Sequence, residues 1–178
     1  MIVLSNNDGC AVARSNEAKE LGISMGVPYH QVKKLCERNG VTVLSSNYEL
    51  CGDMSRRVVS VLSRFAPEMK VDSIYYAFLN FDGIKNPLDL SQRIRETVGR
   101  WTGIPISIGL GSTKTLSKLA NRLSKKDGAG CLEIRETDLE ALAKIEVEDI
   151  WGVGRRLGVR LRRIGVRNAL GLAEAPTS

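Results

Sequence analysis

A glycine- and arginine-rich segment near the C-terminal end of the sequence has the residue types that bind phosphate groups. Residues 150–165, IWGVGRRLGVRLRRIG, place Gly152 and Gly154 between two expected short helices, where glycine lets the backbone come close to a partner. The second helix then starts with outward-pointing N–H groups, which suit a phosphate when arginines flank them. The arginines concerned are Arg155, Arg156, Arg160 and Arg163. The pattern is typical of a helix-hairpin-helix motif, which binds the duplex backbone without reading base sequence.

The charge of the chain is concentrated in the same segment. The formal net charge is +6, and residues 151–178 contain six arginines and one acid, whereas the preceding 150 residues contain 20 basic and 19 acidic side chains. This segregation indicates a polyanionic partner. We expect Leu157, Leu161 and Ile164 to form the buried stripe of the arginine-rich helix. An ordinary helical hairpin with a solvated basic face is the alternative.

Two further segments carry weaker signals. Residues 111–130, GSTKTLSKLANRLSKKDGAG, place Lys125 and other lysines on or just beyond one helix, where they would meet phosphates as point charges. Solvated helix lysines are the commoner outcome for such a pattern. Residues 4–28 place small side chains at Cys10 and Ala11, which would form a flat surface for a base pair, with Lys19 one helical turn further on.

Helices and strands are expected to alternate along the chain. Apolar residues at spacings of three and four predict a long helix over residues 48–65. Shorter helices are expected over 15–21 and 28–38, from Pro87, after Ser112 as N-cap, and from a capping box at Thr137–Glu140. A strand pair is expected within residues 71–81, before the break at Asp82-Gly83. The order of elements favours an α+β fold, a mainly antiparallel sheet with helices on one face, with a domain boundary near residues 143–145.

Several kinds of site and location are disfavoured. His30 is the only histidine, which excludes a multi-histidine metal centre. The four cysteines form no CxxC pair, so we expect reduced thiols rather than a disulfide framework or a zinc site. No apolar run approaches the length of a membrane span, and the first residues do not resemble a signal peptide. These features predict a cytoplasmic protein without a membrane partner.

The three segments occur in the same order and at matching spacing in the Y-family translesion DNA polymerases. The chain most resembles their UmuC type, the catalytic subunit of bacterial error-prone polymerase V, through LSNNDGC, ARSNEAKELGI, SSNYEL, GLGSTKTLSKLAN and IWGVGRR. The resemblance extends over essentially the whole chain. It implies fingers over residues 1–46, a ferredoxin-like palm over 47–143 and a partial helix-hairpin-helix thumb over 144–178.

The same resemblance implies roles for individual residues. Cys10 and Ala11 would face the nascent base pair, and Lys19 and Lys125 would contact the incoming triphosphate. The hairpin at Gly152–Gly154 would grip the DNA backbone, with Arg155, Arg156 and Arg160 beside it.

The sequence departs from the family at its metal-binding carboxylates. The palm motif Ser-Ile-Asp-Glu reads Ser73-Ile74-Tyr75-Tyr76 here, and we expect the family's first strand, which carries another metal-binding Asp, to be missing. Tyrosine hydroxyls are neutral near pH 7 and are poor Mg²⁺ ligands. Asp72 would lie roughly 13 Å from Tyr76 along an extended strand and cannot rebuild the site. No metal or other cofactor is therefore expected, and the tyrosines are expected to pack as a pair into the vacated pocket.

These observations favour a DNA-binding protein that resembles a translesion polymerase of DNA repair and the SOS response but is catalytically inactive. Its expected partner is duplex or primer-template DNA, bound without sequence preference, and further partners would be damage-tolerance proteins. Three alternatives stay open. The chain is a fragment or mis-started copy of an active lesion-bypass polymerase, a non-catalytic scaffold in a damage-tolerance complex, or a degraded gene product that folds poorly.

Overall fold

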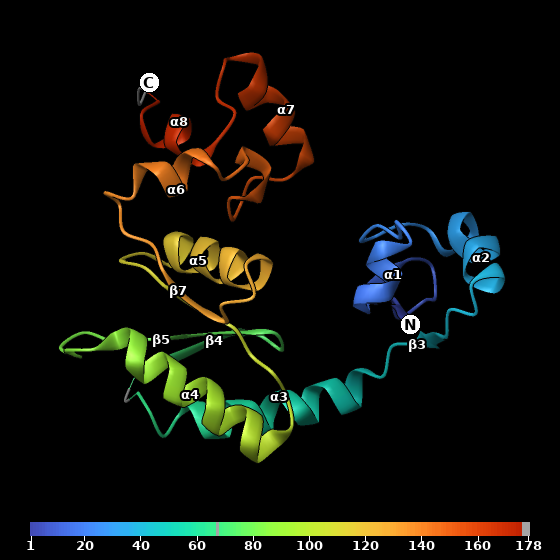
Figure 1. Cartoon of the computed structure of the whole chain (residues 1–178), viewed down its shortest axis with the longest axis horizontal. Coiled ribbons are helices and arrows are strands. Elements are labelled where there is room, and N and C mark those ends of the chain that lie inside the picture. Colours follow the sequence, from blue (N-terminus) through green and yellow to red (C-terminus); the bar gives the residue numbers. More distant parts are fainter. Residues whose placement is uncertain (67, 176–178) are drawn as a thin grey trace. The chain divides into compact units, whose positions relative to one another are not determined.

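The computed structural model describes residues 1–66 and 68–175, and the chain divides into two compact units, Met1–Ser55 and Arg56–Ser178 (Figure 1). The first unit has a hydrophobic core of its own, and the second has two buried clusters. The prediction of three parts, with a boundary near residues 143–145, is a finer division that stays a prediction.

The first unit is a small three-stranded sheet with two helices. Strand β1 (Ile2–Leu4) lies in the centre, antiparallel to β2 (Ala11–Arg14) and parallel to β3 (Val43–Ser45). The helices are α1 (Asn16–Glu20) and α2 (Tyr29–Arg38). The Ser15 side chain caps α1 by accepting a hydrogen bond from the Ala18 amide, as its position in the sequence predicts. Apolar side chains from both helices and the sheet, including Ile2, Ala18 and Cys36, form the core of this unit.

The second unit begins within a long helix and continues as alternating strands and helices. Its elements are α3 (Tyr48–Leu62), which starts in the first unit, β4 (Met69–Ser73), β5 (Tyr76–Leu79), α4 (Pro87–Thr102), β6 (Ile108–Leu110), α5 (Lys114–Lys126) and β7 (Cys131–Glu133). Strands β4 and β5 form an antiparallel hairpin, whereas β6 and β7 pair in parallel. The expected helices over 48–65, from Pro87 and over most of 111–130 are therefore confirmed.

The packing of this part differs from the prediction of one antiparallel sheet with helices on a single face. Among the described residues, β4–β5 and β6–β7 are two separate two-stranded pairs. Ile108 of β6 packs with the cluster around Ile94 and Val98 of α4, but the neighbouring Gly109 faces the backbone of α5. Because successive residues of a strand point to opposite faces, α4 and α5 lie on opposite sides of β6. Figure 1 shows α5 and α4 on either side of the strands.

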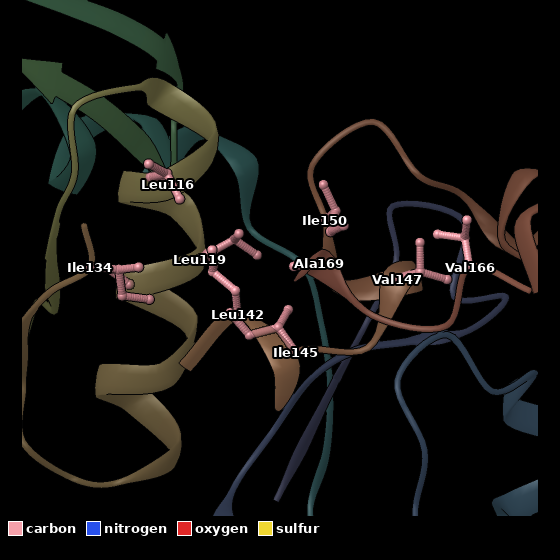
Figure 2. Close-up of a cluster of buried hydrophobic side chains, with 10 residues drawn as sticks. Leu116, Leu119, Ile134, Leu142, Ile145, Val147, Ile150, Val166 and Ala169 are labelled. Carbon is pink, nitrogen blue, oxygen red and sulfur yellow. The ribbon is translucent and has the colours of Figure 1, made fainter. Parts of the chain in front are cut away.

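The C-terminal part of the second unit is a group of short helices packed on α5. They are α6 (Leu139–Ala143), the single 3-10 turn η1 (Val147–Asp149), α7 (Arg155–Arg163) and α8 (Ala169–Ala173). Figure 2 shows Leu116 and Leu119 of α5 gathered with Leu142, Val147 and Ala169 in one apolar cluster. Burial of these side chains holds the C-terminal helices against α5, because apolar surface removed from water stabilises the fold.

Three local predictions are wrong in detail. Helix α5 is capped by Thr113, whose Oγ1 accepts from the Leu116 amide at 3.2 Å, while Ser112 donates to Glu136 instead. Helix α6 starts after Asp138 without a side-chain cap, so the capping box does not form. The first helix of the expected hairpin is only the 3-10 turn η1. No helix of the residues that the structure describes is long and apolar enough to cross a membrane.

Candidate nucleic-acid interface

The β4–β5 hairpin carries Tyr75 and Tyr76, which the sequence resemblance predicts to replace two metal-binding carboxylates. Ser73 pairs with Tyr76, so Ile74 and Tyr75 form the turn of the hairpin. The Tyr75 amide donates to Ser73 Oγ at 3.2 Å, which stabilises the turn. The side chains of Tyr75 and Tyr76 are 70% and 44% exposed, so the prediction that they pack together in a vacated pocket is wrong. A hairpin tip projects its residues away from the core, and this accounts for the exposure.

Asp72 lies closer to the tyrosine site than straight-strand geometry suggests, because the chain reverses direction between Asp72 and Tyr76. Both residues contact Lys118 of α5: its Nζ is 3.2 Å from Asp72 Oδ2 and 4.8 Å from the centroid of the Tyr76 ring. The assumption that residues 72–76 form one extended strand was therefore wrong. Asp72 is nevertheless paired with a cation, and among the described residues no group of three or more His, Cys, Asp and Glu side chains is placed to hold a metal ion.

Aromatic rings and lysines interleave around this hairpin. The members of this aromatic–lysine cluster are Tyr76, Phe78, Trp151, Lys114, Lys118 and Lys125. Lys118 Nζ lies 3.8 Å from the Trp151 ring centroid and 5.4 Å from that of Phe78, and its side chain is only 16% exposed. The Phe78 and Trp151 ring centroids are 6.1 Å apart with planes at 40°. These contacts join the hairpin, α5 and the loop before α7 into one surface.

Close contact between α5 and β6 positions the lysines of the cluster. A Cβ atom at Gly109 would lie 2.1 Å from the Ser117 carbonyl oxygen and 2.1 Å from the Asn121 amide nitrogen, so only glycine permits this approach. Asn121 Nδ2 also donates to the Ser107 carbonyl at 2.5 Å and ties the helix to the end of the strand. Lys114, Lys118 and Lys125 all project from the helix that these contacts hold in place.

Only part of this cluster is predicted by the sequence. Lys125, which lies 5.8 Å from the Tyr76 ring, is a predicted phosphate ligand, and Tyr75 and Tyr76 are expected only as a packed pair at lost catalytic positions. The central position of Lys118 and the contribution of Trp151 are not among the predictions. The spacing of Lys114 and Lys118 by four residues, which places both on one face of α5, was the available signal.

The α7 helix presents its arginines to solvent. Its N-cap is Gly154, which supplies no side-chain cap, and Gly152 has a φ of 92°, a left-handed conformation that favours glycine. Arg155, Arg156 and Arg160 are exposed and, within the part of the chain that the structure describes, have no carboxylate partner. The structure thus places Gly152, Gly154, Arg155 and Arg156 at the N-terminus of α7, whereas Arg160 lies in its last turn.

Arg162 is the exception on α7, because two acids of the preceding turn hold it. Its Nε donates to Glu148 Oε1 at 2.6 Å, and its Nη2 also pairs with Glu146. The hydrogen bond from Arg162 lowers the pKa of the Glu148 carboxyl from its ordinary value, and the hydrogen bonds to Glu148 and Glu146 raise the pKa of Arg162. Arg162 therefore anchors α7 to η1.

The expected apolar stripe of α7 is wrong at two of its three positions. Leu157 and Ile164 are 41% and 74% exposed, and only Leu161 packs against the apolar cluster of the C-terminal helices. The buried position is Gly158, where a Cβ atom would lie 2.5 Å from Glu148 Cγ. Contact between Gly158 and Glu148 turns the inward face of the helix away from the predicted stripe.

The first unit contains the residues expected to face a nascent base pair. Ala11 is fully buried in the core of this unit, whereas Cys10 is half-buried and its amide donates to Ser5 Oγ at 3.2 Å. Of the two, only Cys10 has surface that a base could reach. Lys19 is exposed and donates to Asn16 Oδ1 at 3.0 Å. Lys19 and Lys125 belong to different units, so their joint contact with one triphosphate stays a prediction.

Comparisons with known proteins agree with this geometry. Residues 1–122 match the impB/mucB/samB family. Protein UmuC of Salmonella typhimurium is 44% identical over 99% of this chain and 44% of its own length, and Protein ImpB of the same organism is 41% identical over 100% and 44%. DNA polymerase IV of Picrophilus torridus is 31% identical over 90% of this chain and 46% of its own length. The chain thus spans less than half the length of these curated relatives.

Solved structures show the same fold. The crystal structure of DinB from Sulfolobus solfataricus matches 98% of this chain and 52% of its own with a TM-score of 0.82 at 21% identity. A Dbh ternary complex matches 98% of this chain and 52% of its own with a TM-score of 0.80 at 21% identity. The predicted α+β, Y-family-like fold class is confirmed. With the family match over residues 1–122 and the UmuC similarity over nearly the whole chain, the protein belongs to the impB/mucB/samB family.

Proposed function

We propose that this protein binds the phosphate backbone of duplex or primer-template DNA, without sequence preference, as a non-catalytic relative of the translesion polymerases. The observation that carries the proposal is the set of exposed arginines on α7, two of them in its first turn and Arg160 in its last turn. Arg155, Arg156 and Arg160 have no carboxylate partner among the described residues, and the first turn of their helix has no side-chain cap. Unpaired cations beside free helical N–H groups favour phosphate oxygens.

The nearby acids support this interpretation. Three acids lie shortly before α7 in the sequence: Glu146 and Glu148 bind Arg162, and Asp149 pairs with Arg122. The outward-facing arginines therefore keep their full charge for a partner. Backbone contacts of this kind position a protein on DNA but read no base sequence, so the binding should be general. Relatives named DNA polymerase IV agree with a DNA partner.

The proposed absence of catalysis is supported by the hairpin tip. Tyr75 and Tyr76 occupy the two carboxylate positions, and Asp72 is paired with Lys118. Two-metal phosphoryl transfer needs several anionic oxygens around two ions about 3.5–4 Å apart. The surroundings of the tyrosines supply one neutralised carboxylate and several lysines. We therefore propose a role in damage tolerance that needs no Mg²⁺, in the cytoplasm, and with fingers, palm and thumb divided as the family resemblance implies.

The second candidate function is that of part of an active lesion-bypass polymerase. The 44% identity to Protein UmuC over almost the whole chain favours it, since such similarity preserves fold and much of the surface. Primer extension separates the two candidates, because only the second predicts template-directed nucleotide incorporation.

DNA binding tests the first proposal directly. Anisotropy of a labelled duplex is measured at about 50 to 200 mM salt, for the unmodified protein and for the double variant Arg155→Glu, Arg156→Glu. We expect at least a tenfold loss of affinity, equal across sequences, and a salt slope reduced by about 2 because two phosphate contacts are removed.

A charge-matched control comes from α4. Arg93 and Arg100 are exposed arginines of that helix, and the double variant Arg93→Glu, Arg100→Glu changes the net charge by the same amount. It should bind duplex within about threefold of the unmodified protein, since it alters only the long-range field. Equal losses in both double variants, or binding that ignores salt, would contradict a phosphate site on α7.

A further inference from the structure

Three exposed aromatic rings lie around the tip of the β4–β5 hairpin. Tyr75, Tyr76 and Trp151 are 70%, 44% and 47% exposed, which is unusual for large rings in a folded protein. Lys118 links Tyr76 and Trp151, because its Nζ lies 4.8 Å from one ring centroid and 3.8 Å from the other. We propose that this surface is a binding site for single-stranded nucleic acid, whose unpaired bases stack on the rings.

Two of the rings, those of Tyr76 and Trp151, are held in place before any ligand arrives. Lys118 is fixed by its ion pair with Asp72 at 3.2 Å, and the Trp151 ring rests on its ammonium group and lies 6.1 Å from Phe78. Tyr76 starts β5 and pairs with Ser73 across the hairpin. Preorganised rings lose little conformational entropy when a base stacks on them, which favours binding.

Two further lysines supply charge for the phosphates. Lys114 and Lys125 are exposed and, within residues 1–66 and 68–175, have no carboxylate partner. Their Nζ atoms lie 5.3 Å from the Phe78 ring and 5.8 Å from the Tyr76 ring, respectively. A base stacked on a ring would therefore have a cation within reach of its own phosphate. Aromatic platforms interleaved with cations are typical of sequence-tolerant single-strand binding.

The chemistry favours unpaired bases over a duplex. A ring can stack only on the face of a base, and within a duplex each base is already stacked on both sides. The site contains none of the α7 arginines, so it goes beyond the proposed backbone binding. The two proposals can be tested independently of each other. The three lysines of the cluster outnumber Asp72, the carboxylate paired with Lys118, which leaves the surface cationic as a polyanion requires.

Tryptophan fluorescence tests the proposal, because the chain has two tryptophans and Trp101 lies outside the cluster. The Trp101→Phe protein, which reports only Trp151, is titrated with an oligothymidylate of about 12 nucleotides, within the usual site sizes. We expect quenching of Trp151 that saturates. An abasic sugar-phosphate oligomer of the same length should cause no quenching and bind about tenfold more weakly, since it has the charge but no bases.

Anisotropy with a labelled oligothymidylate extends the test to variants. The double variant Tyr75→Ala, Tyr76→Ala should lose at least tenfold in single-strand affinity and less than twofold in duplex affinity. Tyr76→Phe should bind normally, because stacking needs the ring and not the hydroxyl. Trp101→Ala is the matched control: Trp101 is 55% exposed and has the Arg64 guanidinium carbon 5.1 Å from its ring centroid, the same chemistry at another place.

The outcomes separate this site from the one on α7. The double variant Arg155→Glu, Arg156→Glu should lose duplex binding and retain the quenching of Trp151. The hairpin variants should show the reverse, with duplex binding intact. Both results would support a separate single-strand site. Equal affinity for the abasic oligomer, unchanged binding by the tyrosine double variant, or an equal loss in Trp101→Ala would overturn the proposal. Thermal unfolding of each variant checks that it is folded, which the exposure of the mutated side chains favours.

Discussion

The lysines of the aromatic–lysine cluster and the arginines of α7 have the same charge and different surroundings. Lys118 is 16% exposed, paired with Asp72 and in contact with the rings of Tyr76 and Trp151. Arg156 on α7 is exposed and has no carboxylate partner among the residues that the structure describes. The first cation is used to hold the protein together, and the second is available to a ligand. A basic residue therefore indicates a binding site only when the fold leaves its charge unpaired.

The comparison extends to the acids nearby. Asp72 neutralises Lys118 at the hairpin, and Glu146 and Glu148 neutralise Arg162 on α7. In each region one cation forms an ion pair within the protein, and the other cations remain available to a ligand. The regions differ in their partners for bases: the hairpin has exposed rings, and α7 has none. This difference predicts single-strand binding at one surface and backbone binding at the other.

The largest expected effect is the complete absence of catalysis at the hairpin. Primer extension with the unmodified protein and Mg²⁺ or Mn²⁺ should give no detectable incorporation, because losing the charge stabilisation of even one such element typically costs several kcal/mol in the transition state. The double variant Tyr75→Asp, Tyr76→Glu should also fail, since Asp72 is paired with Lys118 and the Lys118 ammonium group lies beside the restored carboxylates. Template-directed extension that survives rigorous purification would show that the hairpin is a catalytic site after all.

A glycine substitution should separate α5 from β6 and with it disrupt the lysine cluster. In Gly109→Ala the new Cβ would meet backbone atoms of Ser117 and Asn121 at 2.1 Å, so the helix must shift. We expect a loss of about 3 kcal/mol in the free energy of unfolding, measured by urea denaturation. Gly99→Ala in α4 has open space around its Cβ position and should stabilise by about 0.5–1 kcal/mol. Similar midpoints for the two variants would mean that α5 does not lie as close to β6 as described.

Removing one cation from each region should produce opposite results. Lys118→Met keeps the side-chain stem but deletes the contacts with Asp72 and the rings, so the free energy of unfolding should fall by about 1–2 kcal/mol. Arg156→Met should change stability by less than about 0.5 kcal/mol, because its charge contacts solvent. Duplex affinity should fall severalfold in Arg156→Met and change less in Lys118→Met. Chemical denaturation and anisotropy on the same samples test the contrast, and a loss of stability in Arg156→Met would break it.

The smallest expected effect is a pH dependence of the α7 anchor. The pKa of Glu148 is lowered in the folded protein, chiefly by the hydrogen bond from Arg162. A carboxyl with a lowered folded pKa stabilises the fold fully above its unfolded pKa of about 4.3 and loses that contribution as the pH falls through the folded value. The melting temperatures of wild type and Glu148→Gln should therefore differ near neutral pH and converge below about pH 4.

The control for this pH experiment is Glu96→Gln, on the exposed face of α4, whose melting temperature should run parallel to that of wild type throughout the series. If the wild-type and Glu148→Gln curves stayed equally far apart down to about pH 3, the difference between them would arise from packing at Gly158 and not from the charge of Glu148.

The sequence by itself determined the elements with strong local signals. Three- and four-residue apolar spacing located α3, Pro87 marked the start of α4, and Ser15 capped α1, since each depends on interactions within one or two turns. Composition alone also located the excess positive charge at α7. The family motifs and the Tyr75-Tyr76 replacement were equally readable, because they are statements about residue identity.

Only the tertiary structure decided which charges are paired and which faces are buried. Residues 72 and 118 meet because the tertiary fold brings β4 and α5 together, and no local pattern encodes a pair 46 positions apart. The predicted stripe of α7 was wrong because Gly158 allows Glu148 to approach one face, and a glycine carries no hydrophobic signal. Periodicity predicts that a helix has an apolar side, but neighbouring elements determine which side packs. That packing leaves Arg155, Arg156 and Arg160 without a carboxylate partner among the described residues and places Lys118 against its rings.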